Sequence, residues 1–124
     1  MILIFGGAYQ GKLDFARERF GEAKTVCTCA ADGKLSGDAD IIYGWHELVL
    51  GLIRAGVDPV SFTKERLPRI ADKIVICDDI SSGVVPVDPE LRAWREAIGR
   101  CMGLLAGNSD EVWRVFCGIG TRIK

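Results

Sequence analysis

The chain has 124 residues, 48% of them hydrophobic and 27% charged, and its 16 basic and 17 acidic residues leave a formal net charge of -1. This length predicts one domain over residues 1–124, and the near-neutral charge argues against a nucleic-acid-binding protein, which needs a basic excess or stripe. No apolar stretch approaches the roughly 20 residues of a membrane span, and the apolar run 1–5 is too short for a signal peptide.

The first half of the chain alternates apolar runs with helical patterns. Short runs rich in β-branched residues predict strands at 2–5, 25–30 and 41–43. Apolar residues at spacings of three and four predict helices at 14–20 and 45–55. The segment 32–40, which contains Gly33, Ser36 and Gly37, is predicted to be a polar loop.

The second half continues the alternation. Asp58-Pro59 and Asp88-Pro89 each carry the signature of a helix start, with Asp as N-cap and Pro at the first helical position. The first of these helices is expected to be interrupted at Pro68, and the second to run to Leu105. Further strands are predicted at 73–77 and 112–117. Alternating short strands and helices predict an α/β fold with a mostly parallel sheet flanked by helices.

Five cysteines are an odd number, and Cys27, Cys77 and Cys117 fall in predicted strands. These features favour free, buried thiols in a cytoplasmic protein. Cys27 and Cys29 alternate on one strand and face the same side, but without further ligands they do not predict a metal site.

The glycine-rich segment 6–13 lies between the first predicted strand and the first predicted helix. It satisfies most of the phosphate-loop pattern G-x-x-x-x-G-K-[ST] with the residues Gly6, Gly7, Ala8, Tyr9, Gln10, Gly11, Lys12 and Leu13. Glycines let backbone N–H groups turn toward phosphate oxygens, the helix N-terminus adds partial positive charge, and Lys12 would reach the β- and γ-phosphates. We expect this segment to bind GTP or ATP; a plain strand-to-helix turn is the alternative.

Leu13 departs from the pattern, because Ser or Thr is required at this position. The missing hydroxyl is the one that normally ligates Mg²⁺. Phosphate binding by backbone N–H groups can survive this change, whereas a role for Mg²⁺ is left open.

A second segment makes the pattern more specific. Residues 74–86 read Ile-Val-Ile-Cys-Asp-Asp-Ile-Ser-Ser-Gly-Val-Val-Pro. They resemble the adenosylcobinamide kinase/adenosylcobinamide-phosphate guanylyltransferase family, in which an apolar strand precedes Asn-Glu-Val-Gly and then Gly-Ile-Val-Pro. The family's opening, Gly-Gly-Ala-Arg-Ser-Gly-Lys-Ser, is similar to segment 6–13, and its next helix and C-terminus are similar to residues 91–100, 110–113 and 118–124. The resemblance covers residues 1–30 and 72–124 in the same order.

This resemblance implies a parallel α/β phosphate-loop fold that assembles as a homotrimer. It also implies two activities late in cobalamin synthesis: phosphorylation of adenosylcobinamide, and transfer of GMP from GTP through a guanylylated histidine. A nucleotide and adenosylcobinamide are therefore the expected ligands.

The chain departs from the family where part of the chemistry is expected. It is shorter between the second and third strands, where the family carries its histidine segment. Its one histidine, His46, follows the third strand, so the nucleophile role is not carried onto it. Gly44 stands near the position where the family has an Asp or Glu at the end of a strand. Met102-Gly103 stands where the family has Asn-Gln. Together with Leu13, these losses predict that the full bifunctional reaction does not occur. The alternative is a catalytically inactive relative retained for nucleotide sensing or protein assembly.

Asp78 and Asp79 follow the fourth strand, at the end of the sheet where α/β folds bind ligands. Asp79 matches the family's glutamate, and either acid is a candidate for a cation or ribose contact; a solvated loop acid or a helix cap is the alternative.

Two further groups carry weaker signals. Arg95, which matches a family arginine, is a candidate phosphate contact, and Arg92 is expected to pair with Glu96. His46 and Glu47 form a candidate acid/base pair, although a histidine at a helix start is more often structural.

Overall fold

A computed structural model describes residues 1–35, 38–81 and 83–124. Ser36 and Gly37 of the predicted polar loop, and Ser82 of the family-like segment, lie outside the described residues. In chain order the elements are β1 (Ile2–Gly6), α1 (Lys12–Phe20), β2 (Val26–Thr28), β3 (Ile41–Tyr43), α2 (Trp45–Arg54), α3 (Pro59–Arg66), the 3-10 turn η1 (Leu67–Arg69), β4 (Ile74–Asp78), α4 (Pro89–Gly107), β5 (Glu111–Phe116) and β6 (Ile119–Arg122).

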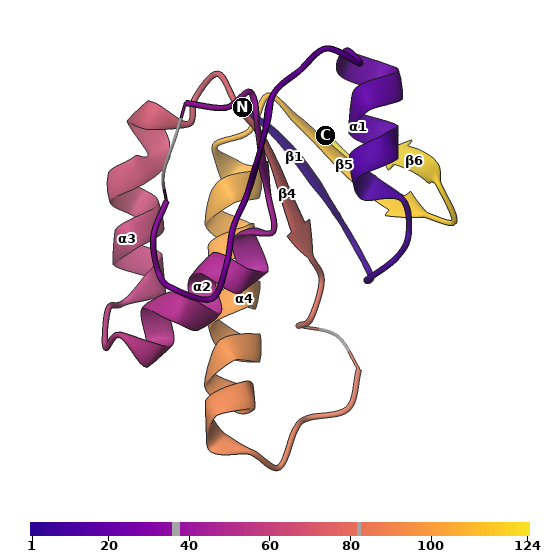
Figure 1. The fold of residues 1–124 in the computed structure, drawn as a ribbon. Coiled ribbons are helices and arrows are strands. Elements are labelled where there is room, and N and C mark those ends of the chain that lie inside the picture. Colours follow the sequence, from indigo (N-terminus) through magenta and orange to yellow (C-terminus); the bar gives the residue numbers. More distant parts are fainter. Residues whose placement is uncertain (36–37, 82) are drawn as a thin grey trace.

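The strands form one sheet in the order β2-β3-β4-β1-β5-β6. Figure 1 labels β4, β1, β5 and β6 of this sheet. All neighbouring pairs are parallel except β5 and β6, which are antiparallel. The predicted α/β fold with a mostly parallel sheet is confirmed. β6 was not predicted, because Gly118 and Gly120 indicate that the chain stops being extended after the preceding strand.

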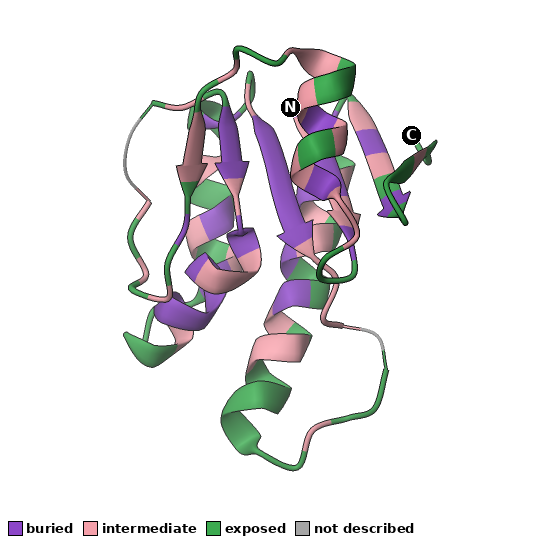
Figure 2. Cartoon of the chain, turned by 45° about the vertical axis from the view of Figure 1, so that its right-hand side comes forward, coloured by how far each residue is buried: buried purple, intermediate pink, exposed green. Residues whose placement is uncertain are grey.

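Helices cover both faces of the sheet. On one face α2, α3 and α4 pack over buried strand residues such as Leu3, Ile42, Val75 and Val112. On the other face α1 packs over a smaller cluster that includes Ile4 and its strand neighbours. Figure 1 shows α1 apart from the other helices, and Figure 2 shows buried residues concentrated in the strands and in the helix surfaces that meet them.

Between the neighbouring strands β1 and β4, the chain connections change from one face of the sheet to the other. The chain leaves β1 toward the face of α1 and leaves β4 toward the face of α4. The loops that follow these two strands therefore part, which opens a crevice at their carboxyl ends. This crevice lies where the glycine-rich segment and Asp78 meet.

Both predicted helix caps are confirmed. Asp58 accepts a hydrogen bond from the N–H of Val60, and Asp88 accepts from Glu90 and Leu91. α3 gives way to η1 at Leu67, next to the predicted interruption. Across the described ranges, no helix combines the length and the apolar character that a bilayer crossing requires.

Three local predictions are wrong. Cys117 does not continue a buried strand: it lies in the turn between β5 and β6, with φ of 51°, and is exposed. Cys27 is only partly buried, whereas Cys29, Cys77 and Cys101 are buried. Among the described residues, Glu96 pairs with Arg100 and not with Arg92, and Arg100 Nη2 lies 2.7 Å from Glu96 Oε1.

Candidate functional site

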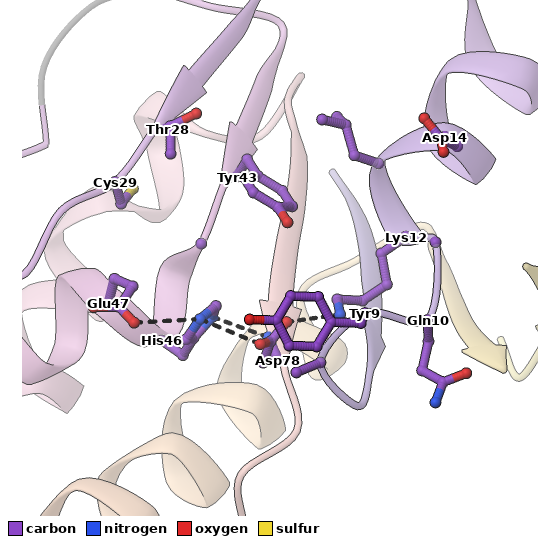
Figure 3. A pocket seen from close by; sticks show the side chains of 14 residues that line it. Tyr9, Gln10, Lys12, Asp14, Thr28, Cys29, Tyr43, His46, Glu47 and Asp78 are labelled. Carbon is purple, nitrogen blue, oxygen red and sulfur yellow. Dashed lines mark hydrogen bonds and ion pairs between the residues drawn. The ribbon is translucent and has the colours of Figure 1, made fainter. Parts of the chain in front are cut away.

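A cleft of about 540 Å³ lies at the carboxyl ends of the parallel strands (Figure 3). One wall is formed by the glycine-rich loop and the start of α1. The opposite wall comes from the ends of β2 and β3 and from the start of α2, and Asp78 of β4 lies at the base. The lining residues are 8–14, Thr28, Cys29, Tyr43, Gly44, His46, Glu47 and Asp78.

The glycine-rich loop depends on two glycines for its path. A Cβ atom on Gly6 would lie 2.4 Å from the backbone oxygen of Val115. The chain therefore passes so close to the backbone of β5 at this point that a side chain does not fit. Gly11 adopts a left-handed conformation, φ 83°, at the N-cap of α1, where an L side chain is unfavourable. Tyr9 also has a positive φ, 59°, and its side chain is fully exposed.

The turn between β5 and β6 braces the loop from outside the cleft. Gln10 accepts two hydrogen bonds from this turn, one at its side-chain oxygen from the N–H of Cys117 (2.7 Å) and one at its carbonyl from the N–H of Gly118 (2.8 Å). Residues remote in sequence thus fix the loop conformation.

Lys12 turns back from the start of α1 into the base of the cleft, and its side chain is only 3% exposed. Its Nζ donates to the carbonyl of Gly7 at 2.7 Å and lies 2.6 Å from Asp78 Oδ1. A buried ammonium requires such partners, because burial without them is costly. The loop lysine is therefore held beside the loop by a carboxylate from the neighbouring strand.

His46 lies on the other side of Asp78 (Figure 3). Its Nδ1 accepts the backbone N–H of Asp78 at 3.1 Å, while its Nε2 lies 3.4 Å from Asp78 Oδ2 and 3.7 Å from Glu47 Oε1. A ring that accepts at Nδ1 carries its proton on Nε2 and is neutral. Burial lowers the pKa of His46, although the Asp78 carboxylate opposes that shift.

This arrangement makes His46 a support for Asp78. Both ring nitrogens face Asp78, and the carbonyl of His46 accepts the indole N–H of Trp94 at 2.7 Å. A nucleophilic histidine needs an unprotonated nitrogen free to attack, and the nitrogen without a proton here is already an acceptor.

The wall opposite the loop offers hydroxyl groups. Thr28 and Tyr43 end β2 and β3, and the hydroxyl of Tyr43 points into the cleft (Figure 3). Neither hydroxyl has a hydrogen-bond partner within the part of the chain that the structure describes. They are available to a polar group of a ligand.

The cleft has no metal ligand at two positions, Leu13 of the phosphate-loop pattern and Gly44 near the strand acid of the resembled family. Leu13 is apolar and packs on the core under α1, and Gly44 is the left-handed N-cap of α2. Among the described residues, no group of three or more His, Cys, Asp or Glu side chains is arranged to hold a metal ion by itself. Mg²⁺, however, needs only one or two carboxylates when phosphates complete its shell, and Asp78 fits that requirement.

The two aspartates have different surroundings. Asp78 lines the cleft, whereas Asp79 Oδ1 accepts from the N–H and the hydroxyl of Ser81, at 3.1 and 2.7 Å, in a local turn. Adjacent residues at a strand end point to opposite sides, which accounts for the difference. The structure brings Asp78, and not Asp79, to Lys12.

Arg95 also lies away from the loop. Its guanidinium donates to the carbonyls of Ser81 and Gly83, each at 2.9 Å, and so ties the segment after β4 to α4. It lines a separate cleft of about 440 Å³ with Arg92 and Arg100.

Several cleft residues were not singled out from the sequence as binding candidates, namely Thr28, Cys29 and Tyr43. The available signal was their place at or just after strand ends, since these ends meet at one edge of a parallel sheet. That signal becomes usable only when the strand order is known.

The chain has distant relatives among characterised proteins. It is 37% identical over 54 residues to the bifunctional adenosylcobalamin biosynthesis protein CobU of Salmonella typhimurium, which is 44% of this chain and 30% of that protein. It is 30% identical over 88 residues to the protein of the same name from Escherichia coli, which is 71% of this chain and 48% of that protein. No family model matches the chain.

The matches confirm the predicted resemblance to the adenosylcobinamide kinase/guanylyltransferase family, and they show that the similarity is distant. The chain spans less than half the length of either curated relative in the matched region.

Proposed function

We propose that the chain is a shortened relative of the cobalamin-synthesis kinase/guanylyltransferase that binds GTP or ATP through the loop 6–13. One observation carries the proposal. The glycine-rich loop, the N-terminus of α1 and the buried ammonium of Lys12 converge at the switch crevice of a parallel α/β sheet, which is where such sheets bind phosphates.

The chemistry of binding follows from these groups. Backbone N–H groups of residues 7–12 and the dipole of α1 attract phosphate oxygens. Lys12 supplies the one full positive charge in the lining as described. Its ammonium would exchange a present partner, the Gly7 carbonyl or the Asp78 carboxylate, for a phosphate oxygen.

If the chain is catalytic, the proposed acceptor is adenosylcobinamide. The hydroxyls of Thr28 and Tyr43 place hydrogen-bonding groups opposite the phosphate loop, so an acceptor would lie between the two walls. In this proposal the protein is a cytoplasmic homo-oligomer, a trimer by analogy with the family; light scattering of the purified chain tests the trimer directly.

A second candidate is a catalytically inactive protein that binds nucleotide for sensing or for assembly. Leu13 and Gly44 provide no metal ligand, and both nitrogens of His46 face Asp78. These changes remove groups needed for group transfer while leaving the loop intact.

Calorimetric titration with GTP and ATP, each with and without Mg²⁺, tests the binding claim. Binding is expected below millimolar nucleotide, and Lys12→Ala should weaken it at least tenfold, whereas Lys64→Ala on the exposed surface of α3 should leave it unchanged. The absence of binding at millimolar nucleotide would refute both candidates. Conversion of adenosylcobinamide to its phosphate supports the enzyme, and binding without conversion supports the inactive relative.

A further inference from the structure

Tyr9 differs from the other residues of the cleft because its side chain is completely exposed to water. Its relative exposure is 104%, and no hydrogen bond or ring contact involves its side chain in the part of the chain that the structure describes. The residue nevertheless lines the cleft. Aromatic side chains usually bury a large apolar area, and the Tyr9 ring has not done so. A ligand in the cleft can supply that burial.

The backbone sets the direction in which the Tyr9 side chain leaves the loop. Tyr9 has a φ of 59°, in the left-handed region, where a bulky residue is an outlier. The next residue, Gln10, is fixed to the turn between β5 and β6 by hydrogen bonds from the N–H groups of Cys117 and Gly118. A strained conformation persists only where its surroundings determine it. The loop therefore presents this ring without any packing of the side chain.

The ring lies on the side of the cleft from which a ligand reaches the loop. In the view of Figure 3 it extends in front of Lys12 and Asp78, toward the wall that carries His46. That wall also presents the hydroxyl of Tyr43 to the cleft. A group bound between the two walls would thus meet an aromatic face on one side and polar groups on the other.

The aromatic ring is particular to this chain. The family that the chain resembles has Gly-Gly-Ala-Arg-Ser-Gly-Lys-Ser, whereas residues 6–13 read Gly-Gly-Ala-Tyr-Gln-Gly-Lys-Leu, so Tyr9 stands in place of an arginine. A neutral phenol does not replace the attraction of a guanidinium for phosphate. It offers a π face instead, which stacks on other flat conjugated rings.

We infer that Tyr9 is a stacking platform, which covers one face of a planar conjugated ring of the ligand and makes the cleft prefer ring-bearing phosphates to ring-free ones. The planar ring belongs either to the base of the nucleotide or to the acceptor, and the stacking chemistry is the same for both. The inference rests on the proposed function, because the loop must hold the phosphates of the ligand.

The test compares Tyr9→Ala with the wild type by calorimetric titration of GTP, ATP, adenosylcobinamide and inorganic tripolyphosphate, which has no ring. Tyr9→Ala should weaken binding of the stacked ligand about fivefold or more, and that of tripolyphosphate by less than about twofold. A loss confined to the nucleotides identifies the base as the stacked ring, and a loss confined to adenosylcobinamide identifies the acceptor.

Two further substitutions of Tyr9 separate the ring from the other properties of the side chain. Tyr9→Phe keeps the ring without the hydroxyl, so it should retain most of the affinity that Tyr9→Ala loses. Tyr9→Leu keeps an apolar side chain without a π face, so it should behave like Tyr9→Ala. Since the side chain is fully exposed, all three variants should melt like the wild type in the absence of ligand.

The outcomes separate the inference from the proposed function. Equal weakening of tripolyphosphate in Tyr9→Ala would overturn the inference in favour of a role in loop conformation, and loss of affinity in Tyr9→Phe would overturn it in favour of the hydroxyl. It is also overturned if Tyr9→Ala weakens none of the ring-bearing ligands that the wild type binds. In each of these cases binding by the wild type leaves the proposed function standing, whereas failure of the wild type to bind any of the four ligands overturns both.

Discussion

The backbone N–H of Asp78 donates to Nδ1 of His46 across 3.1 Å, so the end of β4 and the start of α2 are joined by an imidazole that must be neutral. β3 lies beside β4 in the sheet, and α2 begins two residues after β3. This adjacency brings the histidine to the aspartate although 32 residues separate them. The contact depends on protonation, because an imidazolium has no acceptor nitrogen.

His46 should make the stability of the protein sensitive to mild acid. Burial lowers the pKa of His46 in the folded chain, below the value of roughly 6.5 in the unfolded chain. Its contribution to stability is therefore complete above about pH 6.5 and is lost as the pH falls toward the folded-state pKa. Urea unfolding at pH 7, 6 and 5 should show a decline that is smaller in His46→Asn, whose amide oxygen can replace Nδ1. Equal declines in both proteins would contradict this assignment.

Lys12 and Asp78 should be energetically coupled in the ligand-free protein. Lys12→Met leaves the Asp78 carboxylate and the Gly7 carbonyl without their donor, at a cost of about 1–3 kcal/mol in the free energy of unfolding. Adding Asp78→Asn should recover part of that cost, which a double-mutant cycle measures.

The exposed pair of Glu96 and Arg100 provides the control for this cycle. Its coupling should be about 0.3–0.5 kcal/mol, as expected for a solvated i,i+4 pair. If the pair in the cleft couples no more strongly, the burial of Lys12 has no energetic consequence.

Gly6 and Gly103 should respond oppositely to alanine. A Cβ on Gly6 would meet the backbone oxygen of Val115 at 2.4 Å, so Gly6→Ala is expected to cost about 2–4 kcal/mol. Gly103 lies inside α4 with open space around it, and Gly103→Ala should stabilise the protein by about 0.5–1 kcal/mol. Thermal melting of both variants checks the signs, and a neutral Gly6→Ala would show that β5 can move away from the loop.

Asp88 should contribute to stability through the start of α4. Its side chain accepts from the N–H groups of Glu90 (2.8 Å) and Leu91 (3.4 Å). Asp88→Ala should lower the free energy of unfolding by about 1 kcal/mol, while Asp88→Ser, which keeps an acceptor, should retain most of it. Denaturant unfolding distinguishes the two, and an equal loss in both would point to an effect of charge instead of the cap.

Cys117 should be the most reactive thiol of the native protein. It is exposed, whereas burial raises the pKa of Cys29 to about 12 and also raises the pKa of Cys77 and of Cys101. Titration with a disulfide reagent at pH 8 should show one fast equivalent that disappears in Cys117→Ser. Fast labelling that persists in this variant would mean that another thiol is accessible.

The sequence was most informative where the determining interactions are local. The caps at Asp58 and Asp88, and the loop from Gly6 to Lys12, are each contained in a few consecutive residues. β6 was missed because its residues are mostly exposed and lack a buried alternation; it forms by pairing with β5. Such pairing is a property of two segments and is not visible in one.

The same distinction applies to the cleft. The sequence placed Asp78 and Asp79 at a strand end but could not separate them, because a shift of one residue reverses which side chain faces the loop. The position of His46 beside Asp78 required the order of β3 and β4, which is set by the packing of the whole sheet.

The hydrogen bond from the Cys117 N–H to the Gln10 side chain has a consequence for folding during synthesis. Cys117 is 107 residues away from Gln10, so during synthesis the glycine-rich loop emerges long before the turn that fixes it. Contacts of such long range form late in folding, since much of the chain must be ordered first. The segment proposed to hold the phosphates should therefore reach its final shape only after β5 has joined the sheet, and a nascent chain that ends before Cys117 should not yet bind nucleotide.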